Sequence, residues 1–464
     1  MKQTTGAHIQ RQGTRWLLLI LLLAVVLRLG VALYLGDSTP PAKDETSYSM
    51  LAARLATGHG YSFDQPWYPF TPANTPTAHW SFLYTAFVAA IYSVIGLHPL
   101  GARLAGAILT GILLPFLLYR LSHRLFPDAP PLKLGRLTFT LHHLSALLMA
   151  VYAYFILYSA MVQTEALFIC ALLWSLERAL ALSQHLTAGA GPATGRSGWL
   201  AVTFGLSLGT AALLRQSILP WVVVLFAWLV YTLLHTRRLH LRTLAPLVAA
   251  GLVMLAVILP FTLRNYLVYG DFLLLNSNAG YAMYSAQHPL HGSSFQAFTA
   301  APLPDDLLNG PPLTEAQWDR ALMDRGIAFV LADPARYLRL SASRVADYFE
   351  FWPTETSRLH NAGRLLSFTL FLPFMLAGLG LAGRRSKAGR SWREFLATPV
   401  ALALLFMLFY SLLHISTWAM ARYRLPVDAV ALPFAALTIA ALLSLVTTKA
   451  PRPGLPPPPL RDHP

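Results

Sequence analysis

The sequence predicts an all-α polytopic membrane protein. Of its 464 residues, 55% are hydrophobic and only 12% are charged, about half the charged fraction of an ordinary soluble domain. The mean hydropathy is +0.51, and the apolar residues come in blocks of roughly twenty, the length that a helix needs to cross a bilayer. This composition excludes a water-soluble globular protein and a disordered chain.

Ten apolar blocks are long enough to be transmembrane helices. In chain order they cover residues 16–36, 101–125, 138–157, 161–183, 199–214, 217–235, 243–267, 362–383, 397–416 and 425–447. A further apolar stretch, 80–96, is short and carries Trp80, Tyr84 and Tyr92, residue types that favour the membrane interface. We expect it to form an interfacial or re-entrant helix, because a span here would move the later arginine-rich loops outside.

The charge of the chain supports this topology. The formal net charge is +15. With both termini in the cytoplasm, most of the 35 Lys and Arg residues fall on the cytoplasmic side, where only Asp128, Glu177, Glu394 and Asp462 oppose them. The positive-inside rule predicts this asymmetry, so we assign the basic charge to topology and expect no nucleic-acid partner. The single cysteine, Cys170, excludes an intrachain disulfide, which fits a bacterial inner membrane.

The spans and loops divide the chain into four parts. They are an N-terminal transmembrane module, 1–267, an external, periplasmic loop subdomain, 268–361, the C-terminal transmembrane helices, 362–447, and a proline-rich, disordered cytoplasmic tail, 448–464. The first external loop, 37–100, belongs to the N-terminal module and is the expected catalytic loop. Long external loops are usually functional or folded.

The external subdomain carries two helix-start signals. Thr314 precedes Glu315 as an N-cap, which predicts a helix over 315–331. Asp333 is followed by a proline, a residue type favoured at the first helical position, so a second helix begins there and runs to about Trp352. Its apolar residues predict an amphipathic helix near the membrane.

Two adjacent carboxylates, Asp44 and Glu45, follow the first span. At a membrane surface such a pair can supply a general base together with a second polar or metal contact. The alternative is the N-terminus of a helix, where the helix dipole favours Asp and Glu. The pair alone does not separate these two interpretations.

Several arginines occupy the spans and their outer ends. Arg28 lies inside the first span, Arg215 lies between the fifth and sixth, Arg264 ends the seventh, and Arg422 and Arg424 open the tenth. A charge at membrane depth is costly and usually faces a cavity, although one near a span end can snorkel to the surface. Arginine is a favoured partner of phosphate. The four outer arginines therefore predict a phosphate-bearing ligand at the outer face, beside the carboxylate base.

Two further features concern partners within the bundle. Glu165, at the outer end of the fourth span, and Asp428, in the tenth, are candidate partners for Arg28. Gly205 and Gly209 form a GxxxG pattern in the fifth span, which predicts a close contact between two helices.

Five motifs, in this order, resemble those of the glycosyltransferase C superfamily, in particular the family 39-like membrane transferases. They are Asp44-Glu45-Thr46-Ser47-Tyr48, Thr164-Glu165-Ala166-Leu167-Phe168, a glycine-containing span closed by Leu214-Arg215, Arg264-Asn265-Tyr266 followed by Asn278-Ala279-Gly280-Tyr281, and Arg422-Tyr423-Arg424-Leu425-Pro426. The resemblance runs over about 16–447. The group includes protein O-mannosyltransferases and the lipid A aminoarabinose transferase, and the resemblance implies the GT-C fold.

The resemblance also implies roles for individual residues. Asp44 would be the catalytic base, with Glu45 beside it in the catalytic set. The implied substrate-binding residues are Tyr48, Arg28, His79, Arg103, Glu165, Arg215, Arg264, Asn265, Arg422, Tyr423 and Arg424. Family members often carry a proline pair before the interfacial helix, where this chain has Ala78-His79-Trp80. The resemblance therefore does not identify the acceptor of this chain.

The implied reaction moves a sugar from a polyprenyl-phosphate donor to a hydroxyl of a glycan, lipid or protein acceptor at the outer face, with inversion. No cofactor is obligatory, although the acidic pair could hold Mg²⁺ or Mn²⁺. Three alternatives stay open. They are a glycan ligase or polymerase with a lipid-diphosphate donor, a secondary transporter, for which the sequence offers no internal repeat, and a non-catalytic scaffold protein.

Overall fold

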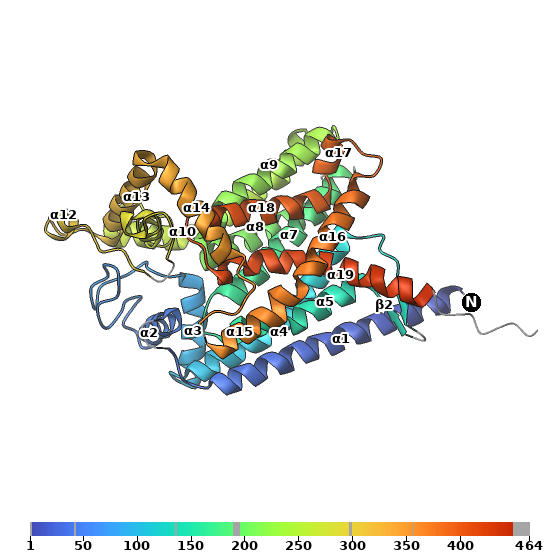
Figure 1. Ribbon diagram of the computed structural model, residues 1–464, viewed down its shortest axis with the longest axis horizontal. Coiled ribbons are helices and arrows are strands. Elements are labelled where there is room, and N and C mark those ends of the chain that lie inside the picture. The colour runs from blue at the N-terminus through green and yellow to red at the C-terminus, as the bar shows by residue number, and fades with distance from the viewer. Residues whose placement is uncertain are drawn as a thin grey trace, which may run out of the picture.

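The computed structural model shows a bundle of long helices with a layer of shorter helices at one end (Figure 1). It describes residues 2–40, 43–134, 137–188, 195–296, 299–355 and 357–448. Within these residues nine helices are long and apolar enough to cross a membrane, and a bent pair forms a tenth candidate. The predicted polytopic all-α membrane fold is confirmed.

The membrane-spanning helices follow the ten predicted blocks. They are α1 (Lys2–Leu35), α4 (Pro99–Leu125), the bent pair α5 (Leu141–Val151) and α6 (Ala153–Ala160), α7 (Glu165–Thr187), α8 (Gly195–Leu214), α9 (Leu219–His235), α10 (Leu241–Tyr269), α15 (Arg358–Arg364) joined by a π turn (Leu365–Thr369) to α16 (Leu370–Lys387), α18 (Pro399–Ser416) and α19 (Leu425–Thr448).

The third span is broken at Tyr152, where α5 and α6 meet at 55°. The last carbonyls of a helix lack helical amide partners, and Met149 and Ala150 lie in the last turn of α5. The buried guanidinium of Arg28 donates to these two carbonyls, at 3.2 and 3.1 Å, and to Ser159 Oγ at 3.1 Å. Arg28 therefore pairs with backbone carbonyls and a hydroxyl, and not with Glu165 or Asp428, the candidate carboxylates. A carbonyl without a donor is costly in a membrane, so these hydrogen bonds stabilise the break.

Helices α8 and α10 approach each other through the glycine pattern. A Cβ on Gly205 would lie 2.4 Å from the carbonyl oxygen of Ala250, and one on Gly209 would lie 2.6 Å from Val257 Cβ. Only a residue without a side chain permits this approach. The predicted close contact of the fifth span is therefore confirmed.

The layer of shorter helices, which we call the cap, comprises the described residues between 37 and 98 and between 270 and 357 (left in Figure 1). Its helices are α2 (Asp44–Ala56), α3 (Phe82–Ile95), α11 (Ala279–Gln287), α12 (Asp305–Leu308), α13 (Glu315–Ala332) and α14 (Pro334–Tyr348). The cap thus joins the two predicted external segments, which are distant in sequence. Helix α3, a short apolar helix, occupies the stretch that we expect to form an interfacial or re-entrant helix.

Both predicted helix starts in the second segment are confirmed. Thr314 forms a full capping box at the start of α13, and Asp333 caps α14. Helix α14 ends at Tyr348, one turn before the predicted end at Trp352. At this end the Tyr348 carbonyl, which has no helical amide partner, accepts a hydrogen bond from Arg424 Nη1 at 2.6 Å.

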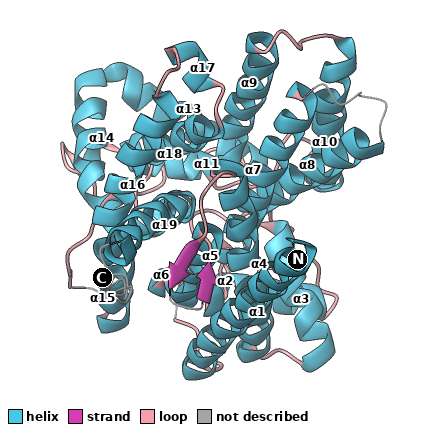
Figure 2. Ribbon diagram, turned by 90° about the vertical axis from the view of Figure 1, so that its right-hand side faces the viewer, coloured by secondary structure: helices cyan, strands magenta, loops and turns pink. Residues whose placement is uncertain are grey.

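The opposite end of the bundle, which we call the hairpin end, carries the antiparallel hairpin of β1 (Leu132–Leu134) and β2 (Leu137–Phe139) and the short helix α17 (Trp392–Leu396) (Figure 2). The sequence did not predict this hairpin. Its second strand takes the first residues of the predicted third span, which begins at α5 instead.

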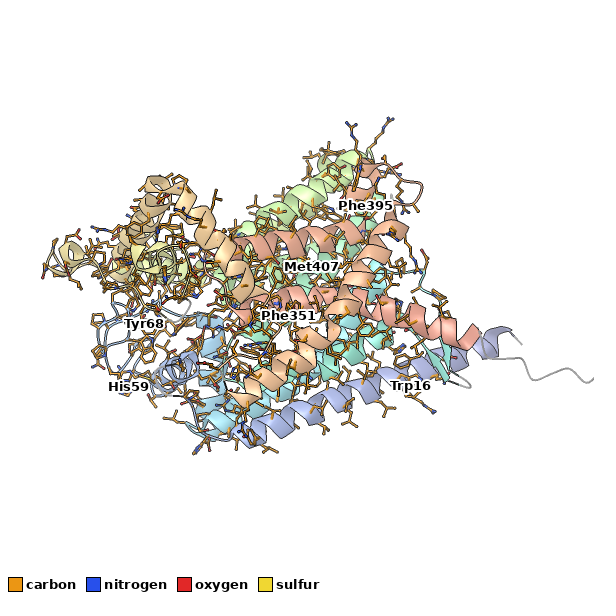
Figure 3. All side chains as sticks on the ribbon, viewed as in Figure 1. Trp16, His59, Tyr68, Phe351, Phe395 and Met407 are labelled. Carbon is orange, nitrogen blue, oxygen red and sulfur yellow. The ribbon has the colours of Figure 1, made fainter. Side chains whose placement is uncertain are left out.

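Labelled side chains mark the two ends of the molecule. In Figure 3, Trp16 and Phe395 lie at the hairpin end and Tyr68 lies in the cap. The predicted cytoplasmic tail, 448–464, falls outside the described residues from 449 onward.

Candidate active site

Four charged side chains alternate in sign where the cap meets the bundle, and we call them the charge chain. Arg422, in the short 3-10 turn before α19, donates from Nη1 to Asp44 Oδ2 at 2.6 Å and lies 3.8 Å from Glu165 Oε1. Arg215, which follows α8, donates from Nη2 to the same Glu165 oxygen at 2.6 Å. The order is Asp44, Arg422, Glu165, Arg215.

The charge chain is partly open to a ligand. The Glu165 side chain is only 3% exposed, whereas those of Asp44 and Arg422 keep 21% and 18% exposure. The Tyr423 ring centroid lies 5.2 Å from the guanidinium carbons of both Arg422 and Arg215, and an aromatic ring at this distance attracts a cation. The buried glutamate thus holds two arginines whose outer edges stay accessible.

The ionisation of Asp44 depends on its arginine. Burial alone would raise the pKa of this carboxyl, but the charge and hydrogen bond of Arg422 outweigh burial, with smaller help from the charge of Arg215. The pKa of Asp44 is therefore held below its ordinary value. At neutral pH the carboxylate is ionised and can accept a proton.

Aromatic side chains form a wall near Asp44. Tyr48, one turn along α2, packs against Trp80 and Tyr84 at centroid distances of 5.2 and 5.1 Å, and His79 packs edge-on against Trp80 at 4.6 Å. Burial lowers the pKa of His79 to about 4, so its ring is neutral. Neither ring nitrogen of this buried histidine has a hydrogen-bond partner among the described residues.

Glu45 points away from the charge chain. Its Oε2 accepts from Arg103 Nη1 and from the amide of Val162, both at 2.8 Å, and Arg103 also donates to the carbonyls of Ala160 and Ser38. Both side chains of the ion pair are almost fully buried. We therefore propose positioning roles for Glu45 and Arg103, in place of the catalytic and substrate-binding roles implied by sequence.

Arg264 and Asn265 brace the cap rather than line the charge chain. Arg264 Nη1 donates to the carbonyl of Thr77 at 2.8 Å, and Asn265 Nδ2 donates to the carbonyls of Leu273 and Leu275 at 3.2 and 2.8 Å. These bonds fix the loops on either side of the cap. We propose that both residues act through these loops.

Arg424 and Arg28 both support the bundle. Arg424 Nε donates to Asp428 Oδ1 at 3.0 Å, and Tyr152 OH donates to Asp428 Oδ2 at 2.7 Å. The three groups are buried and connect the start of α19 to the break in the third span, which Arg28 also stabilises. Of the six arginines implied by the resemblance, the structure brings only Arg215 and Arg422 to the charge chain.

Sequence reasoning missed Glu315 as a central residue of the cap. Its carboxylate accepts hydrogen bonds from Thr71, Thr77 and Ser277 at 2.7–2.9 Å. The amide of Ala78, at 2.8 Å, and the hydroxyl of Tyr269, at 3.2 Å, complete the set. The only local signal was the capping threonine before it, which indicates a helix start and nothing about partners in another loop.

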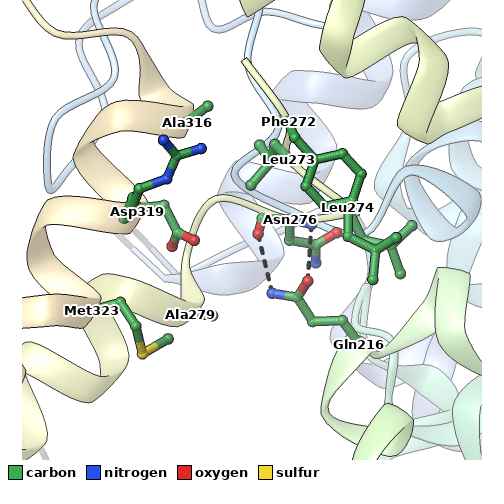
Figure 4. Close-up of a pocket in the computed structure, with 11 residues that line it drawn as sticks. Gln216, Phe272, Leu273, Leu274, Asn276, Ala279, Ala316, Asp319 and Met323 are labelled. Atoms are coloured by element: carbon green, nitrogen blue, oxygen red, sulfur yellow. Dashed lines mark hydrogen bonds between the residues drawn. The ribbon is translucent and has the colours of Figure 1, made fainter. Parts of the chain in front are cut away.

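A separate cavity of about 270 Å³ lies between the cap and the bundle (Figure 4). It is lined by Gln216, Asn276, Asp319 and Arg320 together with apolar residues, and the Gln216 amide is bonded to the backbone of Asn276 on both sides. Burial raises the pKa of Asp319 to about 6. None of the lining residues belongs to the charge chain, although Gln216 directly follows Arg215.

The charge chain is poorly suited to a metal ion. In the described part of the chain, no three His, Cys, Asp or Glu side chains gather as a metal site would require. The two carboxylates of the charge chain, Asp44 and Glu165, already share the guanidinium of Arg422. A divalent cation between them would have to displace that guanidinium, so we assign no chemical step to a metal.

No family model matches the sequence, and no curated protein matches it. Solved structures do match. AglB, an archaeal oligosaccharyltransferase from Archaeoglobus fulgidus in complex with an inhibitory peptide and a dolichol-phosphate, superposes on 95% of this chain with a TM-score of 0.57 at 15% identity. The oligosaccharyltransferase of the same organism, tethered with an acceptor peptide, superposes on 93% with a TM-score of 0.59 at 14% identity.

These matches cover 52% and 50% of the archaeal chains, so this chain spans about half their length. ArnT from Cupriavidus metallidurans, bound to undecaprenyl phosphate, matches over 92% of this chain and 78% of its own, with a TM-score of 0.40 at 14% identity, too low to support an argument. The oligosaccharyltransferase superpositions show the fold. This chain has the GT-C fold of membrane glycosyltransferases, as its motifs predicted.

Proposed function

With the GT-C fold as premise, we propose that this protein is a membrane glycosyltransferase that moves a sugar from a polyprenyl-phosphate donor to an acceptor hydroxyl. The charge chain carries this proposal. One ionised carboxylate, Asp44, lies beside two arginines that a buried glutamate holds in place. A base next to a phosphate-binding pair is what transfer from a sugar phosphate requires.

The proposed reaction is a single displacement. The acceptor oxygen attacks the anomeric carbon while Asp44 takes its proton, so the new glycosidic bond forms as the bond between that carbon and the phosphate oxygen breaks. The electron pair of the broken bond leaves on the phosphate. Arg422 and Arg215 stabilise this growing negative charge. Attack from the face opposite the leaving group inverts the anomeric centre.

The aromatic wall would bind the acceptor or the donor sugar. His79 is neutral, buried and without a protein partner for its ring nitrogens, so it can exchange hydrogen bonds with a sugar hydroxyl. Tyr48 would hold Trp80 and the wall in place. In this proposal the cap faces the periplasm, which puts the basic hairpin end in the cytoplasm and agrees with the positive-inside rule.

The test is sugar transfer in proteoliposomes with a panel of polyprenyl-phosphate sugars. Wild type should transfer at least one sugar, and Asp44→Asn should lose transfer about 10²–10⁴-fold, the usual contribution of a general base. Asp64→Asn, which removes an exposed carboxylate from the same loop, should keep full activity. Transfer that survives Asp44→Asn would reject Asp44 as the base and keep the enzyme class.

A lipid-diphosphate donor is the second candidate, because the charge chain offers two arginines and a diphosphate offers two anionic groups to match them. The same proteoliposomes separate the two donors. Transfer from the diphosphate-linked sugar alone would replace the first proposal. Binding of neither lipid would reject both.

A further inference from the structure

One face of α4 changes from apolar to basic as the helix approaches the hairpin end. Ile108, Ile112, Phe116, Arg120 and Arg124 follow one another at four-residue spacing, so each lies beside the next along a ridge that winds gradually around the helix. Ile108 and Ile112 are 45% and 43% exposed on the outside of the bundle. The face therefore presents an apolar strip that ends in two arginines.

The two arginines belong to a cluster around one buried glutamate of α7. Glu177 Oε1 accepts from Arg120 Nη2 at 3.0 Å and from Arg124 Nε at 3.2 Å, and Glu177 Oε2 is paired with the neighbouring Arg178. Arg124 Nη1 also donates to Gln184 Oε1 at 2.9 Å. Three guanidinium groups thus converge on a single carboxylate.

This cluster carries more positive than negative charge at a place where charge is costly. One carboxylate balances one of the three guanidinium groups, and both helices cross the membrane. The side chains of Arg120 and Arg124 remain 41% and 29% exposed, whereas that of Glu177 is 2% exposed. Cations at the edge of a bilayer are stabilised by an anionic group.

We propose that this face of α4 binds an anionic phospholipid of the leaflet at the hairpin end. The lipid phosphate would contact Arg120 and Arg124, and an acyl chain would run along Phe116, Ile112 and Ile108. An apolar strip that ends in two cations matches the polarity and charge of an anionic phospholipid lying along this ridge of the helix. The proposal concerns a site apart from the charge chain and does not depend on the proposed transfer reaction.

The positive-inside rule alone does not account for this arrangement. It requires basic residues in loops and at span ends. Exposed arginines such as Arg384 and Arg385, at the end of α16, satisfy it without an ion pair to any carboxylate of the described residues. At α4 the guanidinium groups are held in a fixed orientation by Glu177. A fixed pair of guanidinium groups is suited to one phosphate.

The test is lipid retention by the full-length protein in detergent, measured by native mass spectrometry. Wild type should retain phosphatidylglycerol in preference to phosphatidylcholine, and the double variant Arg120→Gln/Arg124→Gln should bind phosphatidylglycerol about 30-fold more weakly, since each basic side chain near a lipid surface contributes on the order of a fivefold factor. Arg384→Gln/Arg385→Gln removes the same charge from the same end and should leave binding unchanged.

A thermal unfolding measurement distinguishes loss of lipid binding from misfolding of the double variant. Arg178 still pairs with Glu177 in the double variant, so the protein should fold, and phosphatidylglycerol should raise the Tm of wild type and of the control but not of the double variant. Equal retention of phosphatidylcholine, equal loss in the control, or displacement of the lipid by inorganic phosphate would overturn the proposal. Preferential retention of undecaprenyl phosphate would replace the phospholipid with the carrier lipid and overturn it too.

Discussion

At the scale of single residues, Arg422 controls the ionisation of Asp44. The pKa of Asp44 is depressed because Arg422 outweighs burial, so Asp44 stays ionised as the pH falls to the ordinary aspartate value of about 3.9. In Arg422→Gln burial prevails and the pKa of Asp44 rises. We predict that the acid limb of the kcat/KM profile for sugar transfer moves to higher pH.

The control for this shift is Arg54→Gln, which removes a cation from the same helix at a site where its side chain donates to Ser62 Oγ. Its acid limb should coincide with that of wild type. Arg422→Gln will also lower the rate, because it loses a phosphate contact, so the position of the limb and not its height is the readout. An unmoved limb in Arg422→Gln would show that another group is the base.

Neutral substitution of the neighbours Asp44 and Glu45 should affect different properties, transfer activity for Asp44 and stability for Glu45. Glu45→Gln leaves the buried Arg103 without its counter-charge, and we predict a loss of about 3 kcal/mol in stability, seen as a lower Tm in detergent. Asp44→Asn, at a partly exposed pair, should lose transfer while its Tm stays within a few degrees of wild type. Equal effects on Tm would contradict the separation of positioning from catalysis.

At the scale of elements, the length of the apolar blocks predicted the ten spans, because a bilayer fixes the length and composition of what crosses it. It did not predict the break at Tyr152, where neither proline nor glycine interrupts the pattern. That break is stabilised by Arg28, more than a hundred residues away in sequence. The sequence also did not predict the hairpin before α5, because strands of three residues leave almost no periodic signal.

The contact between α8 and α10 gives a test at this scale. Gly205→Ala places a Cβ against the carbonyl of Ala250, and overpacking of this kind costs about 1–3 kcal/mol. We predict a lower Tm for Gly205→Ala. Gly198→Ala is the matched control on the same helix, because nothing lies within 4 Å of its Cβ, and alanine favours a helix by up to about 1 kcal/mol. A Tm that falls equally in both variants would contradict the packing argument.

At the scale of the whole molecule, the site depends on contacts that the sequence order conceals. The motifs placed Asp44, Arg215 and Arg422 in one set, and the structure joins them through Glu165. The motifs also included Arg264 and Arg424, whose partners are backbone carbonyls and a bundle aspartate. A sequence shows which side of the membrane an arginine lies on, but only the fold shows which oxygen it meets.

Glu315 gives the test at this scale, because it fastens the loop that carries His79 to the second cap segment. The amide of His79 donates to Thr77 Oγ1, and Thr77 donates to Glu315. Glu315→Gln replaces one accepting oxygen by an amide group, which leaves two or more buried donors unpaired, at about 1–3 kcal/mol each. The aromatic wall should loosen while Arg422 and Arg215, held by the bundle, keep their places.

We therefore predict that Glu315→Gln lowers kcat for sugar transfer about tenfold or more, whereas the Kd for undecaprenyl phosphate changes less than twofold. Asp306→Asn, which breaks an exposed ion pair with Arg325 in the same cap, should change neither quantity. A donor that binds normally but reacts slowly would show that the cap positions the acceptor side of the site. Weakened lipid binding in Glu315→Gln would instead mean that the cap also positions the arginines of the charge chain. The assignment of the acceptor side to the cap and of donor binding to the bundle would then be wrong.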